Sequence, residues 1–168
     1  ALFSSTRGNA GPTHDYFSMH LDFSTSGAVH IDMVPYITKI IDAFPEKITG
    51  VQSTPASDRL FQVRPPSEAK YLPEDQACAF HHTTAQLLFL SRVCRDIQAT
   101  VAFLTTRVKK PDIDDWGKLK RVLTYLLSTR SLRLTLSAES LTNIVWYVDA
   151  SHQIHDDCKG HTGSILTF

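Results

Sequence analysis

The chain lacks several features that would point to a particular class of protein. It has no net charge, because 17 Lys and Arg residues balance 17 Asp and Glu residues among 168. Its overall charge therefore favours neither nucleic acid nor a membrane surface. It has no apolar run near the roughly 18 residues needed to span a membrane, and no signal-peptide pattern. Its three cysteines have no disulfide-framework spacing, which predicts reduced thiols and an intracellular location.

The charge is unevenly distributed, although its total is zero. Residues 92–133 carry ten cations and four anions, a local charge of +6, and the segments on either side each carry −3. A basic middle between acidic ends indicates a local partner, and cations near a nucleic-acid backbone add salt-sensitive affinity. The cations predicted to contact phosphates are Arg107, Lys109, Lys110, Lys118, Lys120 and Arg121. The alternative is that they only keep the outer faces of helices solvated.

Two alternating runs predict a β-hairpin after a flexible lead-in at residues 1–13. Apolar and polar residues alternate on either side of a turn at 24–27, which gives the hairpin one apolar face. If Phe23 faces Val29, Asp22 lies opposite His30 and His20 lies opposite Asp32. These two His and two Asp side chains either ligate a metal or make cross-strand polar contacts on a solvated face.

A short helix and a long loop are predicted after the hairpin. Pro35 opens the helix, apolar residues recur on one side of it, and Pro45 ends it. Residues 46–72 contain prolines and many Ser and Thr residues, which predicts a loop with one extended piece at 60–63. A connection of this length is uncommon inside one compact unit, so it predicts a boundary between subdomains.

Three stretches of helical periodicity predict a helical layer in the middle of the chain. The first helix begins at Pro73, and the second has Asp96 as its N-cap. The third begins after Pro111 with three aspartates, which match the positive end of the helix dipole.

The last part of the chain predicts β-strands. Residues 132–137 alternate, and residues 143–151 (NIVWYVDAS) run from uncharged, mostly apolar residues into Asp149. A short apolar run of this kind predicts a strand covered on both faces. A carboxylate at the end of a buried strand is costly unless it meets a metal, a cation or water, so Asp149 is the main indication of chemistry. The prediction is an α+β fold in four parts: 1–13, 14–72, 73–131 and 132–168.

The loop after Asp149 contains four residues of zinc-ligand types. His152, His155, Cys158 and His161 recur at every third position. Such regular spacing within one loop differs from the paired arrangement of a zinc finger. The sequence therefore leaves two interpretations, a zinc site and a polar surface loop between two strands.

Several of these segments together resemble the reverse transcriptase–ribonuclease H region of copia-type LTR retrotransposon polyproteins. The resemblance covers nearly the whole chain, from about Tyr16 to Phe168. It depends on five motifs in the same order, of which no single one is specific. These are VHIDMVPYI at 29–37, STP at 53–55, LLFLSRVCRDI at 87–97, WGKLKRVLTYL at 116–126, and YVDAS at 147–151 with Thr162 and Gly163.

This resemblance implies a fold, a cofactor and partners. Asp149 would correspond to the first metal-binding carboxylate of ribonuclease H, which holds Mg²⁺ to cleave the RNA strand of an RNA–DNA hybrid. The C-terminal strands would be the first part of a ribonuclease H-like sheet, completed by the rest of the polyprotein or by other chains. The basic helices would correspond to the thumb and connection, which grip the hybrid through its phosphates.

The sequence also departs from the family pattern. It contains no Tyr-x-Asp-Asp polymerase motif, Ser151 stands where the family has Asp, and His152 stands where it has Trp. The other three ribonuclease carboxylates would lie downstream of Phe168, which indicates a piece of a longer protein. One carboxylate cannot assemble a two-metal site, so we expect this segment alone neither to polymerise nor to cleave. Two functions remain open: a nucleic-acid-binding part of a retroelement polymerase, and a non-enzymatic structural subunit of a larger assembly.

Overall fold

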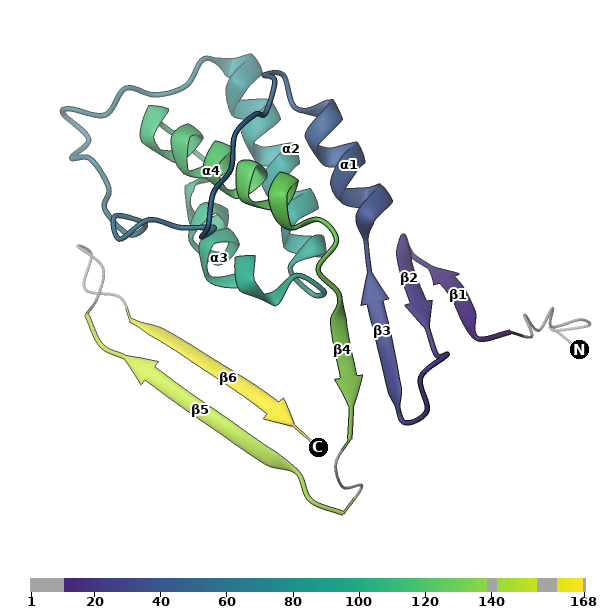
Figure 1. Ribbon diagram of the computed structural model, residues 1–168. Helices are drawn as coiled ribbons and strands as arrows, with labels where there is room; N and C mark the ends of the chain where they lie inside the picture. The colour runs from purple at the N-terminus through teal and green to yellow at the C-terminus, as the bar shows by residue number, and fades with distance from the viewer. Residues whose placement is uncertain (1–10, 139–141, 154–159, 168) are drawn as a thin grey trace, which may run out of the picture.

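The computed structural model describes residues 11–138, 142–153 and 160–167. They form an α+β fold with a four-stranded antiparallel sheet, a group of α-helices and a separate two-stranded sheet (Figure 1). The strands are β1 Thr13–Tyr16, β2 Met19–Asp22, β3 Ala28–Asp32, β4 Leu134–Ser137, β5 Val145–Ser151 and β6 His161–Thr167. The helices are α1 Val34–Ala43, α2 Glu74–Leu90, α3 Gln98–Arg107 and α4 Ile113–Thr129, with a 3₁₀ turn, η1, at Arg95–Ile97.

The predicted N-terminal hairpin is present, with one strand more than expected. Phe17 and Ser18 both have positive φ and form a tight turn of the handedness that suits a β-hairpin. This turn splits the single strand expected at 17–23 and pairs β1 with β2, so the lead-in ends earlier than predicted. The register between β2 and β3 is the predicted one, with Asp22 opposite His30 and His20 opposite Asp32.

The strand β4 joins the N-terminal sheet, which differs from its expected place at the start of the C-terminal strands. The sheet order is β1-β2-β3-β4, and Leu134 lies opposite Ile31 in the antiparallel β3–β4 pair. His30 and Thr135 share a side-chain hydrogen bond of 3.0 Å across the same pair. The free edge of β3 is therefore completed by a strand about 100 positions later, a pairing that local alternation cannot reveal.

One hydrophobic core joins the N-terminal sheet to all four helices. It includes Ile31 of β3, Ile37 of α1, Leu87 of α2, Leu104 of α3 and Leu123 of α4, all of them buried. Most positions of the apolar stripes predicted for the helices pack into this core, but Leu88, predicted to lie on the stripe of α2, is 51% accessible. Both sides of the predicted subdomain boundary thus share one core.

The long loop between α1 and α2 runs along α4 (Figure 1) and places Ile48 and Leu60 in the same core. The prediction of an extended piece at 60–63 is wrong for residues 60 and 61. Residues 58–61 form a turn, in which the Leu60 N–H donates to the Ser57 carbonyl. Asp96 is also not an N-cap: its carboxylate accepts a hydrogen bond from the Tyr125 hydroxyl, and α3 begins from η1 without a side-chain cap.

The hairpin of β5 and β6 stands apart from the rest of the molecule (Figure 1). Its register pairs Val145 with Thr167 and Ser151 with His161. Every described β5 side chain is exposed, with Trp146 67% and Val148 64% accessible. The prediction that this strand is covered on both faces is therefore wrong for the described residues. Among those residues, no helix is long and apolar enough to cross a membrane.

Candidate nucleic-acid interface

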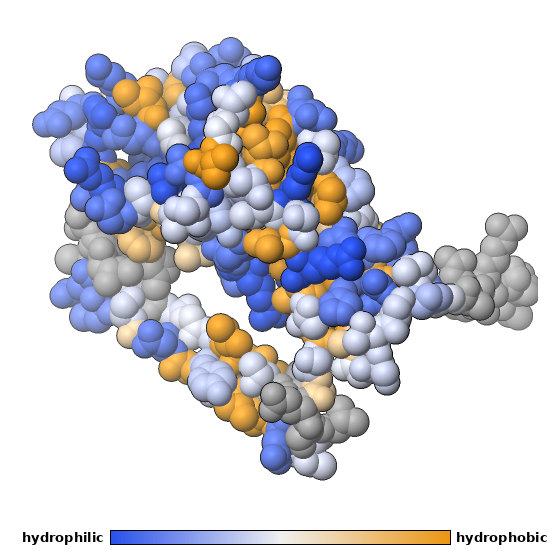
Figure 2. Space-filling view, in the orientation of Figure 1, coloured by the Kyte–Doolittle hydropathy of each residue, from blue (hydrophilic) through white to orange (hydrophobic). Residues whose placement is uncertain are grey.

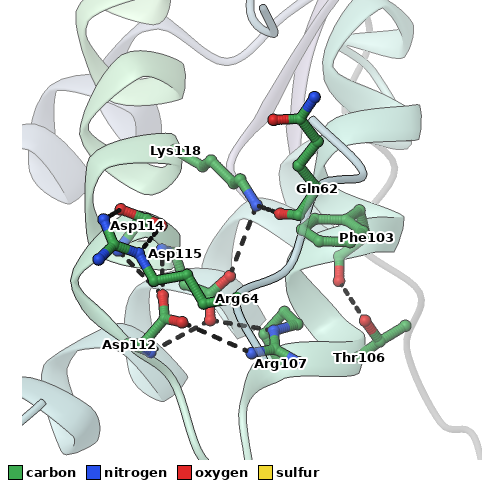
Figure 3. Close-up of polar contacts among 9 residues, drawn as sticks. All are labelled: Gln62, Arg64, Phe103, Thr106, Arg107, Asp112, Asp114, Asp115 and Lys118. Carbon is green, nitrogen blue, oxygen red and sulfur yellow. Dashed lines mark hydrogen bonds and ion pairs between the residues drawn. The ribbon is translucent and has the colours of Figure 1, made fainter. Parts of the chain in front are cut away.

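The start of α4 is built around two buried carboxylates (Figure 3). Asp112 is the N-cap, and its Oδ1 accepts hydrogen bonds from the backbone N–H groups of Asp114 (2.9 Å) and Asp115 (3.0 Å). Asp115 completes a capping box by accepting the backbone N–H of Asp112 at 3.1 Å. These bonds satisfy N–H groups that would otherwise lack helical partners, which explains the aspartates at positions 112 and 115.

Two of the predicted phosphate-binding cations compensate these carboxylates. Arg107 Nε donates to Asp115 Oδ2 at 3.0 Å, and its Nη2 lies 4.0 Å from Asp112 Oδ2. Lys118 Nζ lies 3.8 Å from Asp115 Oδ1. Burial raises the pKa of Asp115 and lowers the pKa of Lys118, since both lose contact with water. Burial therefore disfavours the charged form of each group, and the attraction between these cations and carboxylates offsets part of that cost.

The long loop is tied to α4 by ionic and hydrogen-bonded contacts. Arg64 forms a two-point pair with Asp114, at 2.5 Å from Nε and 2.9 Å from Nη2, and this contact holds the pKa of the Asp114 carboxyl below its usual value. Lys118 Nζ donates to the Gln62 carbonyl at 2.6 Å. The two parallel hydrogen bonds between Arg64 and Asp114 fix the orientation of both side chains as well as pairing their charges. The loop therefore has a defined position on the helix.

The next turns of α4 hold two further predicted cations. Lys120 Nζ donates to Glu46 Oε2 at 2.5 Å, and Arg121 Nη2 donates to Thr54 Oγ1 at 2.9 Å. The Lys120 contact is the largest cause of a lowered pKa at Glu46. Four of the six predicted cations, Arg107, Lys118, Lys120 and Arg121, therefore have partners within the chain.

The remaining two predicted cations lie exposed just after the end of α3. Lys109 and Lys110 are exposed, and the Lys110 ammonium lies 4.2 Å from the centre of the Tyr71 ring. Arg92, Arg95 and Arg130 are also exposed, and no carboxylate of the described residues lies within 4.0 Å of any of these five side chains. We call Arg92, Arg95, Lys109, Lys110 and Arg130 the outward-facing cations.

A cleft of about 1060 Å³ separates β4 and the η1 region from the β5–β6 hairpin. Arg92, Arg95 and Gln98 line one side of it, and Trp146 lines the hairpin side. The choice of six cations from the sequence omitted Arg92 and Arg95, although both lie in the basic tract. The signal that could have found them is their position between two helices, where a short connection exposes long side chains.

Asp149 is exposed near the end of β5, and its Oδ1 accepts a hydrogen bond from the backbone N–H of Ala150 at 2.9 Å. No group of three or more His, Cys, Asp or Glu side chains in the described parts of the chain is arranged to hold a metal ion. His152 is exposed. The other predicted zinc ligands, His155, Cys158 and the side chain of His161, lie outside the described residues.

The polar face of the N-terminal sheet makes contacts within the chain. His20 Nδ1 and Asp15 Oδ1 are 3.0 Å apart, and this hydrogen bond raises the pKa of His20. Arg133 Nε lies 3.5 Å from Asp32 and its Nη1 lies 3.8 Å from Asp22. His30 bonds to Thr25 and Thr135. These are polar contacts, in line with one of the two alternatives, but their partners differ from the expected ones. Among the described residues, no hydrogen bond or ion pair joins His20 to Asp32 or His30 to Asp22.

Among curated proteins, the chain is similar to a Saccharomyces cerevisiae protein named "Putative transposon Ty5-1 protein YCL074W", with 26% identity over 160 residues. The match covers 94% of this chain and 50% of the other, so the chain spans about half the length of that relative. No family profile matches the chain, and no solved structure matches it. The similarity supports a retrotransposon origin for this chain.

Proposed function

We propose that this chain is a segment of a copia-type retrotransposon polymerase, from the thumb and connection into the start of ribonuclease H. In this proposal the segment binds the phosphate backbone of an RNA–DNA hybrid. The similarity to a transposon protein over most of the chain supports the origin. The observation that carries the binding function is the set of outward-facing cations, which lack carboxylate partners among the described residues.

The buried ion pairs change which cations are expected to bind. Lys118 is largely buried and already donates to Gln62, and Arg107 is held against Asp112 and Asp115. Moving either side chain to a phosphate would leave buried carboxylates uncompensated, which is costly. The outward-facing cations can contact phosphates without that cost. Binding is therefore expected to depend on Arg92, Arg95, Lys109 and Lys110 more than on the cations at the start of α4.

A salt titration tests this proposal. The affinity of the whole chain for a short RNA–DNA hybrid would be measured by filter binding over a series of salt concentrations. The log–log slope is expected to be negative, because each phosphate contact in a duplex contributes about −0.9 to it. In the variant R92A/R95A/K109A/K110A, the loss of four contacts is expected to make that slope shallower by about 3.6 and to remove most of the affinity.

The matched control removes four exposed cations outside the basic tract, in the variant K39A/K47A/R59A/K70A. It has the same net charge as the test variant, so an effect of total charge alone would lower affinity equally in both. Equal losses, or an affinity that does not depend on salt, would contradict the proposal.

Ribonuclease activity of this segment is not part of the proposal. A site for paired Mg²⁺ ions needs several carboxylates, and the exposed Asp149 has no such group around it among the described residues. In the parent polymerase Asp149 would supply one oxygen ligand to Mg²⁺. We assign no cleavage step to this chain.

A second function is favoured by the exposed hairpin. Val145, Trp146, Tyr147, Val148, Ile165 and Leu166 are all at least 45% accessible, and contiguous exposed apolar surface marks sites of association. The chain would then be a non-enzymatic subunit that packs against other proteins through this hairpin. Analytical ultracentrifugation of the purified chain distinguishes the two functions. A monomer that binds hybrid supports the first, whereas a stable protein complex with no salt-dependent hybrid binding supports the second.

A further inference from the structure

We propose that the cleft beside Trp146 binds single-stranded nucleic acid, with one base stacked on the indole ring and the neighbouring phosphates against Arg92 and Arg95. The inference deepens the proposed function and rests on it, because it names a second form of nucleic acid and the place where it binds. It shares Arg92 and Arg95 with the backbone-binding proposal and adds the β5–β6 hairpin, which that proposal does not use.

The size and position of the cleft suit an extended ligand. Its volume of about 1060 Å³ slightly exceeds the roughly 300–1,000 Å³ typical of small-molecule pockets. One wall is the β4 strand with the connection from α2 to α3, and the opposite wall is the hairpin. Figure 2 shows this space as an open channel between the body and the hydrophobic side chains of the hairpin. A strand could therefore pass through it.

The charge of the lining favours an anion. Arg92 and Arg95 are its only charged side chains among the described lining residues, and no Asp or Glu accompanies them. Both arginines are exposed. Gln98, Ser137 and Ser164 add neutral hydrogen-bonding groups around them. Two guanidinium groups with neutral donors and no opposing carboxylate match a phosphodiester backbone.

The hairpin presents an aromatic ring to the same cleft. Trp146 is 67% accessible and lies opposite Leu166 in the β5–β6 register. The other tryptophan, Trp116, is 7% accessible, stacks on Phe44 with ring centroids 4.9 Å apart, and donates its N–H to Glu46. Trp116 is thus a core residue, whereas most of the Trp146 side chain is accessible for stacking on another group.

The combination of an aromatic platform and a basic groove favours a single strand over a duplex or a peptide. Bases of a single strand can turn outward and stack on an aromatic side chain, whereas bases of a duplex are already stacked on each other. A peptide of complementary shape would need acidic groups for Arg92 and Arg95. Stacking on Trp146 requires no particular base, so binding is expected to tolerate different sequences.

Tryptophan fluorescence tests the inference in the intact chain. The probe is an oligothymidylate of about 12 nucleotides, and the control is a strand of equal length without bases. The oligothymidylate is expected to quench the fluorescence of the unaltered chain. In the variant W146F only the buried Trp116 emits, so quenching should disappear while affinity, measured by anisotropy of a labelled strand, is largely kept. Trp146→Ala is expected to weaken binding of the oligothymidylate about tenfold.

Binding of the strand without bases distinguishes the contribution of Trp146 from that of the two arginines. The strand without bases is expected to bind the unaltered chain and W146A equally, because it offers nothing to stack. The variant R92A/R95A is expected to bind both the oligothymidylate and the strand without bases more weakly. Each of these results would support a site that reads a base at Trp146 and phosphates at the two arginines.

Three results would overturn the inference. In the first, the chain binds the hybrid but the oligothymidylate does not quench Trp146 fluorescence. This result would support the proposed function and contradict the stacking site. Absence of binding to hybrid and to single strand alike would remove both. A blue shift of Trp146 fluorescence on raising the protein concentration, with dimers in ultracentrifugation, would show that a second copy of the chain covers the hairpin instead.

Discussion

The indole Nε1 of Trp116, in the first turn of α4, donates a hydrogen bond of 2.6 Å to Glu46 Oε1 in the loop that follows α1. Lys120, one turn further along α4, donates to the other oxygen of the same carboxylate at 2.5 Å. One side chain of the loop thus holds two side chains of α4. The ionisation of the Glu46 carboxylate is therefore coupled to the packing of the loop against α4.

Replacing Glu46 is expected to make stability less dependent on pH. Hydrogen bonds from Lys120 and then Trp116 lower the pKa of Glu46 from its ordinary 4.5. An acid whose pKa falls on folding stabilises the fold above its ordinary pKa, and this contribution is lost as pH falls through the lowered value. Glu46→Gln should cost about 1 kcal/mol at pH 7 and progressively less below pH 4.5.

Urea unfolding at pH 7 and at pH 3 measures this difference. Asp58→Asn, which removes an exposed loop carboxylate, serves as the control. A cost at Glu46 that stays the same at both pH values would show that shape, and not charge, sets its contribution.

Core substitutions on either side of the long loop are expected to act on one unfolding transition. Ile37 of α1 and Leu104 of α3 are 1% and 0% accessible and belong to the same core. Ile37→Ala and Leu104→Ala should each cost about 2–5 kcal/mol through lost burial and the cavity left behind. Denaturant unfolding followed by circular dichroism and by Trp116 fluorescence should give coincident curves for both variants. Leu88→Ala, at a 51% accessible position of α2, should change stability by less than about 0.5 kcal/mol. Two separate transitions would mean that residues 14–72 and 73–131 unfold independently.

The N-cap of α4 is expected to depend on both the shape and the charge of Asp112. Asp112→Ala removes the acceptor of two backbone N–H groups and one of the carboxylates that face Arg107, so we expect a loss of about 2 kcal/mol or more. Asp112→Asn keeps an acceptor oxygen and loses only the charge. Its loss of stability should be smaller, and the difference between the two losses, measured in the same thermal unfolding experiment, would isolate the contribution of the cap. Equal losses for the two variants would assign the effect to charge alone.

Cys94 is expected to react slowly with thiol reagents. Burial raises the pKa of the Cys94 thiol from 9.0 to about 11, and a rise of two units lowers the reactive thiolate population about a hundredfold near neutral pH. The rate of modification of C78S/C158S, measured at pH 8, should therefore be about a hundredfold below that of an unfolded control in urea. It should also rise tenfold per pH unit up to about pH 10. A fast reaction that does not depend on pH would show that the thiol is accessible and ionised.

Much of the local structure was predictable from residue spacing. Pro35 lies in the first turn of α1 and Pro45 follows its end, the aspartates after Pro111 cap α4, and the alternation on either side of residues 24–27 sets the register of Asp22 against His30. Each of these features depends on residues within one or two turns of each other. The turn at Phe17 and Ser18 was missed, since neither residue is a usual choice for positive φ.

The candidate site was less predictable, because residues distant in the sequence decide which cations are paired within the chain and which are exposed. Lys118 and Lys110 have the same charge and lie in the same basic tract, yet Lys118 is held by Asp115 and Gln62 while Lys110 lies over Tyr71 at the surface. Periodicity places Lys118 on α4 and Lys110 just after α3. It does not say which loop will cross that helix.

The sequence by itself therefore determined the helices, the N-terminal hairpin register and the basic character of residues 92–133, since each follows from side-chain period and local hydrogen bonding. Only the tertiary structure decided that β4 completes the N-terminal sheet, that Arg107 and Lys118 face buried carboxylates, and that Trp146 lines an open cleft. Those outcomes depend on which distant segments lie together. Bringing distant segments together costs chain entropy, and burial of the shared core offsets that cost. A short stretch of residues does not specify which segments will meet.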